Sequence, residues 1–155
     1  MVIQSTVPGV ITALRTLFAA VLPAGFPALF IGPPPGGDVP DRYVCVAYGG
    51  DDRPGVIGTA RRPEYGNTGD VGSEAYGVWC AVSTASGDQD AAAQMAVTDG
   101  YFQTCVAAVR ANPKLGGVLQ AMGSADLGPF EWSIEDGGNI ATVFFQVVVD
   151  AGWVS

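Results

Sequence analysis

Histidine is absent from the chain of 155 residues, and charged residues make up only 14% of it. Without histidine there is no Ser-His or Cys-His catalytic pair and no histidine-bearing metal motif. The patterns Gly-x-Ser-x-Gly and Gly-x-x-x-x-Gly-Lys-Ser/Thr, which mark esterase nucleophiles and phosphate-binding loops, are also missing. The sequence therefore predicts a protein that is not an enzyme and that holds no cofactor or metal.

Basic residues are scarce as well, because seven Lys and Arg stand against fifteen Asp and Glu, for a formal charge of −8. Affinity for nucleic acids and for anionic membranes depends on basic side chains that attract phosphates, so neither is an expected ligand. The charged fraction is well below the usual value of about a quarter. The surface therefore either carries many small neutral residues, which the 22 glycines and 11 prolines favour, or is hidden against partners.

Cysteine is limited to three residues, each inside an apolar run: Cys45, Cys80 and Cys105. An odd number of cysteines at wide spacing argues against a disulfide framework and against a zinc site. We expect three buried free thiols in a reducing compartment.

No uninterrupted apolar run is long enough for a membrane span. The most apolar segment near the N-terminus, residues 7–31, is broken by Pro23, Gly25 and Pro27 and carries Arg15 in its first half. No basic segment followed by an apolar stretch and a cleavage site indicates a signal peptide. We expect no contact with a membrane.

Periodic apolar patterns predict two helices, at 7–21 and 89–111, and strands at 42–48, 74–83, 115–122, 129–134 and 140–151. Thr6 is the expected N-cap of the first helix, and Asp88, at the end of a Ser-Gly-Asp turn, that of the second. Gly100, inside the second helix, suggests a close packing contact. This order of elements predicts a single α+β domain over residues 1–155, with one mainly antiparallel sheet and both helices packed on one face.

Two of these elements have a distinct apolar pattern. The second helix is expected to bury Ala92, Met95, Phe102, Cys105, Val106 and Val109. The strand 140–151 has one wholly apolar face, and its other face is half apolar. Such a strand is either central in its sheet or covered on its second face by another subunit.

Residues 49–73 form the most unusual segment, with seven glycines, two prolines and no sustained period. Loops of this length in a compact domain are uncommon and are usually functional or disordered. The segment holds three of the seven basic residues, so we predict that it is the docking element, with Arg53, Arg61, Arg62 and Glu64 as interface candidates. The alternative is charge that is simply solvated.

Two acidic pairs, Asp51-Asp52 and Glu135-Asp136, lie among glycines in predicted turns, where acidic residues are common. Neither pair has the alternating oxygen-ligand spacing of a calcium loop. We interpret both pairs as turn residues rather than as catalytic or metal-binding groups.

The order of motifs resembles a known family. A strand with the sequence Glu-Ala-Tyr-Gly-Val-Trp-Cys-Ala-Val at 74–82 leads into Ser-Gly-Asp-Gln-Asp at 86–90 and a long alanine-rich helix. That helix ends in Asn-Pro-Lys-Leu-Gly-Gly-Val at 112–118, and a long final strand follows. This arrangement, over about 42–151, resembles tail terminator proteins of long-tailed, siphovirus-type bacteriophages that infect actinobacteria.

The resemblance implies a structural virion protein that closes into a homo-oligomeric ring, usually a hexamer. Such a ring binds the last layer of tail tube protein, ends tube growth and offers the surface for head attachment through a head-completion or neck protein. DNA passes through its lumen without specific binding, and the ring is assembled in the host cytoplasm and stays at the tail–neck junction of the virion. The alternatives are another head–tail neck component, such as a head-closure or tail-completion protein, or a monomeric ligand-binding domain.

Overall fold

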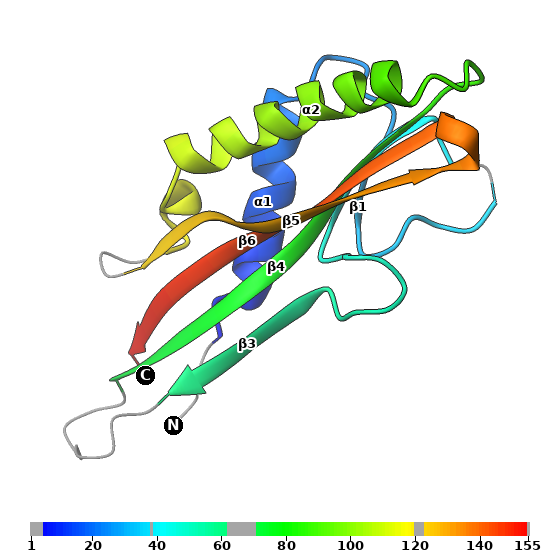
Figure 1. The fold of residues 1–155 in the computed structure, drawn as a ribbon. Helices are drawn as coiled ribbons and strands as arrows, with labels where there is room; N and C mark the ends of the chain where they lie inside the picture. The colour runs from blue at the N-terminus through cyan, green and yellow to red at the C-terminus, as the bar shows by residue number, and fades with distance from the viewer. Residues whose placement is uncertain (1–4, 38, 62–70, 120–122, 155) are drawn as a thin grey trace.

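The computed structural model describes residues 5–37, 39–61, 71–119 and 123–154, which form two helices and a six-stranded sheet (Figure 1). The elements are α1 (Val7–Val21), β1 (Leu29–Ile31), β2 (Arg42–Val46), β3 (Val56–Arg61), β4 (Val71–Ala85), α2 (Ala91–Ala111), the short 3-10 helix η1 (Leu115–Gly117), β5 (Ser124–Glu135), a second 3-10 turn η2 (Asp136–Gly138) and β6 (Ile140–Val154). The predicted α+β class with a mainly antiparallel sheet is confirmed.

The sheet is built around a long antiparallel pair, β4 and β6, each of 15 residues and paired along their whole length. The strand order is β1-β2-β4-β6-β5, and β3 also pairs with β4. Among the pairings of the described strands, only that of β1 with β2 is parallel. β6 is therefore a central strand, with β4 on one side and β5 on the other. On its second face, away from the helices, Val148 is 37% exposed.

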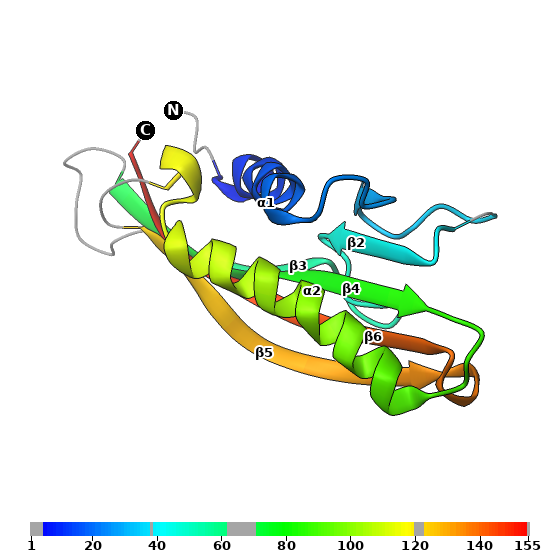
Figure 2. The same ribbon diagram turned by 90° about the horizontal axis from the view of Figure 1, so that it is seen from above.

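Both helices lie on the same face of the sheet, as predicted (Figure 2). Phe145 of β6 contacts Phe18 of α1 and Phe102 of α2, with ring centroids 6.2 and 5.1 Å apart. The predicted inner face of β6 is buried in full: Ala141, Val143, Phe145, Val147 and Val149. No helix within the described residues has the length and apolarity needed to cross a membrane.

Thr6 is the N-cap residue of α1, as predicted, but its side chain does not form the expected capping hydrogen bond to the helix. Thr6 makes no side-chain cap; its backbone N–H and its hydroxyl both donate to Glu74 Oε1, each at 2.5 Å. Ser5 Oγ donates to the other carboxylate oxygen at 2.9 Å. The Glu74 side chain is only 8% exposed. Its hydrogen bonds hold it at the N-terminus of α1, which is the positive end of the helix dipole.

The second helix begins at Ala91, two residues later than expected, and its N-cap is Asp90 rather than Asp88. The Asp90 carboxylate accepts from Ala93 N at 3.1 Å. The buried face of α2 includes the polar residues Gln94 and Thr98. Ala92 and Met95, which the apolar pattern predicted for this face, are exposed and half-buried respectively.

Those two buried polar side chains are satisfied by the sheet. Thr84 Oγ1 on β4 accepts from Gln94 Nε2 at 2.5 Å and lies 2.7 Å from Thr98 Oγ1. The second half of the predicted face is correct: Phe102, Cys105, Val106 and Val109 are buried.

Three further predictions fail. A Cβ added at Gly100 would meet nothing within 4 Å, so this glycine makes no close packing contact. Residues 115–119 form η1 and a turn rather than a strand, because Gly116 and Gly117 adopt positive φ angles of 69° and 93°. Residues 49–73 are not one long loop, because β3 occupies Val56–Arg61 and β4 already begins at Val71.

Candidate subunit interface

The predicted interface residues have separate positions in the fold. Arg53 lies between β2 and β3, and Arg61 is the last residue of β3. Arg62 and Glu64 fall outside the described residues. The structure therefore describes the side-chain contacts of Arg53, and for Arg61 it describes the position of the backbone.

Arg53 belongs to a short excursion from an otherwise continuous strand pairing. β2 pairs with the second half of β4, and β3 pairs with the first half of the same β4 edge. At the junction, Tyr48 N donates to Trp79 O at 2.9 Å and Trp79 N donates to Gly55 O at 2.8 Å. Backbone hydrogen bonds to β4 are therefore present directly before and directly after residues 49–54, which form a loop outside the sheet.

The Arg53 side chain fixes this loop on the sheet face opposite the helices. Its guanidinium carbon lies 3.9 Å from the ring centroid of Trp79 and 5.5 Å from that of Phe144. Its Nε donates to Gly49 O, and its Nη2 forms an ion pair with Glu131 Oε2 at 2.6 Å. The guanidinium lowers the pKa of the Glu131 carboxyl through a hydrogen bond and its charge.

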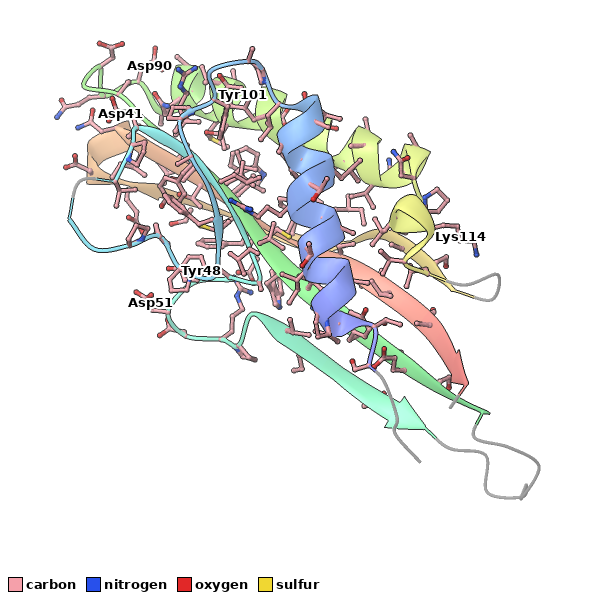
Figure 3. All side chains as sticks on the ribbon, turned by 180° about the vertical axis from the view of Figure 1, so that it is seen from behind. Asp41, Tyr48, Asp51, Asp90, Tyr101 and Lys114 are labelled. Carbon is pink, nitrogen blue, oxygen red and sulfur yellow. The ribbon has the colours of Figure 1, made fainter. Side chains whose placement is uncertain are left out.

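Tyr48 completes the attachment of the loop (Figure 3). Its hydroxyl donates to Asp51 Oδ1 at 3.1 Å, and its ring packs edge-on against Phe144 at 6.3 Å. Burial, followed by the hydrogen bond to Asp51, raises the pKa of the Tyr48 phenol to about 12. A Cβ at Gly49 would lie 2.8 Å from Trp79 Cβ, so only glycine permits this close approach.

A shallow acidic depression of about 570 Å³ lies beside the loop. Four carboxylate residues, Asp51, Asp52, Glu131 and Glu135, line it together with Arg53, which lies among them. No group of three or more His, Cys, Asp or Glu residues in the described ranges is arranged to hold a metal ion.

The sheet edges are the features that sequence reasoning missed. Within the described residues β3 pairs only with β4, and β5 pairs only with β6, so each has an unpaired outer edge. Large apolar side chains are exposed on both strands: Ile57 by 57%, Phe130 by 54% and Ile134 by 39%. Pro129 was the available sequence signal for β5, since proline within a strand is typical of an edge.

The cysteines are buried and free, as expected from the sequence. Burial raises the pKa of Cys45 and of Cys105 to about 12 and raises that of Cys80 as well. At neutral pH all three are thiols, and a thiol is a weak nucleophile.

A comparison with models of known protein families found no match, and a comparison with curated proteins found none either. We therefore argue function from the sheet edges, the attached loop and the chemistry of the described side chains.

Proposed function

We propose that the chain is a structural virion protein, a tail terminator, that closes into a ring at the end of the phage tail tube. In this role it ends tube polymerisation, offers the surface for head attachment and lets DNA pass through the lumen without specific binding. The ring consists of six copies that repeat one contact around an axis, and it is assembled in the host cytoplasm and retained at the tail–neck junction.

The observation that carries the proposal is the pair of unlike outer strands, β3 and β5, with exposed apolar side chains on both. A ring requires two different surfaces on each subunit, because its contacts run head to tail. An unpaired strand edge is a ready site for pairing with another chain, and exposed apolar residues beside it favour such an interface.

Composition and chemistry support the same role. A formal charge of −8 repels phosphates, which suits a lumen through which DNA slides. Several titratable groups in the described residues have structural roles: the thiols are buried, Glu74 accepts hydrogen bonds at the start of α1, and Glu131 pairs with Arg53.

The depression lined by Asp51, Asp52, Glu131 and Glu135 is open and mostly polar, unlike the apolar pockets that take small ligands. A monomeric ligand-binding domain is therefore the weaker alternative. Another neck component would use the same sheet edges, and it differs from a terminator only in the structure that it caps.

The test combines mass photometry with electron microscopy of the purified chain, alone and mixed with tail tubes. We expect closed rings that bind tube ends and stop further polymerisation. Binding to head portals but not to tubes would replace the terminator with a head-closure protein. A ligand-binding monomer that ignores both structures would overturn the proposal.

A further inference from the structure

The strands at the margin of the sheet differ in how well they are protected against pairing with another chain. β1 has only three residues and is followed by a run of prolines at 33–35. β5 contains Pro129, and its register is irregular between Leu127 and Phe130. Short strands, prolines and bulges are the usual devices that prevent edge-to-edge association.

β3 has none of these devices. Its six residues contain no proline and pair with β4 in an unbroken register. Trp79 N donates to Gly55 O, so hydrogen bonding along this antiparallel pair alternates from Gly55 onward. The backbone N–H and C=O groups of Val56, Gly58 and Ala60 therefore face away from β4, toward the outside of the sheet.

We propose that the outer edge of β3 pairs with the C-terminal half of β5, residues 130–134, of a second copy of this chain. This inference rests on the proposed ring and assigns its repeating contact. β5 is regular again from Phe130 to Glu135, beyond its proline and bulge, and so provides a strand segment that matches β3 in length.

Strand direction fits this contact. β3 is antiparallel to β4, β4 to β6, and β6 to β5, so β5 runs antiparallel to β3. A second copy placed beside the first, around a ring axis to which the strands are tilted, brings its β5 to β3 as an antiparallel neighbour. The same step repeats from copy to copy, as a head-to-tail ring requires.

The side chains also match when the sheet is continued across the contact. Phe130, Trp132 and Ile134 lie on the helix face, because they pair with core residues of β6. On the helix face of β3, Val56 is half-buried and Gly58 has no side chain, and beside them lies a hollow of about 220 Å³ lined in part by Val7, Glu74 and Tyr76. The exposed rings and methyl groups of one copy thus meet a strand that leaves room for them.

The alternation of side chains between the two faces of a sheet restricts the register in which β5 of one copy pairs with β3 of the next. Apolar groups stay on the same face only in registers that place Phe130 opposite Val56, Gly58 or Ala60. The longest overlap places Phe130 opposite Ala60 and Ser133 opposite Ile57. Neighbouring copies are then staggered along the strands, as closed sheets require.

Disulfide trapping tests the contact directly, because the three native cysteines are buried. Full-length Ile57→Cys protein is mixed with a tagged Ser133→Cys protein and oxidised mildly; a Val97→Cys variant, exposed on α2, serves as the control. We expect the yield of the disulfide between Ile57→Cys and Ser133→Cys to be at least about tenfold higher than the yield of the disulfide between Ile57→Cys and Val97→Cys. A tenfold ratio corresponds to a contact that contributes about 1.4 kcal/mol.

The Ala60 N–H points away from β4, so the substitution Ala60→Pro removes a donor at the outer edge and leaves the hydrogen bonds between β3 and β4 in place. We expect the protein concentration needed for assembly to rise about tenfold. If wild-type rings form but the mixed disulfide does not, or Ile57→Cys links to itself, the β3–β5 contact is wrong while the ring proposal stands. If the disulfide forms but the assemblies do not cap tubes, the contact stands and the terminator function fails. A protein that neither assembles nor cross-links overturns both.

Discussion

Replacing Arg53 by alanine tests whether this residue belongs to the fold or only to an interface. The Arg53 side chain is three-quarters buried, and its guanidinium stacks on Trp79 and donates to Gly49 O. A partly desolvated cation–π contact contributes about 1–2 kcal/mol, and a hydrogen bond from a charged donor about 1.5–3 kcal/mol. The ion pair with Glu131 adds little, because that carboxylate is exposed to solvent.

These contacts share one side chain and do not add fully, so we expect Arg53→Ala to lower the free energy of unfolding by about 2–3 kcal/mol. For a domain of this size the melting temperature should fall by about 4–10 °C. The assay is a thermal melt followed by circular dichroism, at a concentration where the protein is monomeric.

Two variants serve as controls. Arg110→Ala removes an arginine whose contact to Asp126 is 3.5 Å long and whose side chain is 62% exposed, so its effect should stay within about 0.5 kcal/mol. Arg53→Lys keeps the charge but loses the planar stacking group, and it should fall between wild type and alanine. An Arg53→Ala protein that melts like Arg110→Ala would refute the reasoning and leave Arg53 as a surface charge.

Three further predictions concern the monomer. Glu74→Ala leaves Thr6 N–H without its acceptor and should cost about 1–3 kcal/mol in urea unfolding, whereas Glu74→Gln keeps an acceptor and should cost less; equal losses would argue against the cap. Gly100→Ala should raise stability by about 1 kcal/mol, because its Cβ enters open space; a loss would reveal a hidden contact. The three thiols should resist a disulfide reagent at pH 8 until urea unfolds the chain, since burial holds the pKa values of Cys45 and Cys105 near 12; rapid labelling of the folded protein would contradict their burial.

The sequence predicted best those elements whose own periodicity is strong. The first helix was placed at its observed bounds, and the central strand β6 revealed its inner face from Ala141 to Val149. In both cases the apolar pattern that predicts the element is also the pattern buried by the core. The local sequence pattern and the tertiary packing therefore favour the same secondary structure in these two elements.

Several of the failures depended on a contact distant in the chain. The Thr6 hydroxyl bonds Glu74, which is 68 residues away in sequence, instead of a helix N–H. Gln94 and Thr98 are buried because Thr84 satisfies them, and no apolar period reports that partner. β3, with glycine at its centre, is a strand because it completes an edge that β2 leaves open on β4.

The candidate interface was predicted only in part. Composition pointed to residues 49–73, and the structure finds an attached loop and an edge strand within that segment. Which strand edges stay unpaired depends on the order of strands in the sheet, and a single sequence does not contain that order. The roles of Arg61, Arg62 and Glu64 remain predictions.

The size of the purified wild-type protein tests the central claim most directly. Native mass spectrometry over a range of concentrations, with and without tail tubes, measures it without any substitution. A closed oligomer of defined copy number, six for a hexamer, that binds tube ends is the predicted result. A strict monomer of 15.9 kDa at every concentration, in the presence of tubes as well, would contradict the proposal.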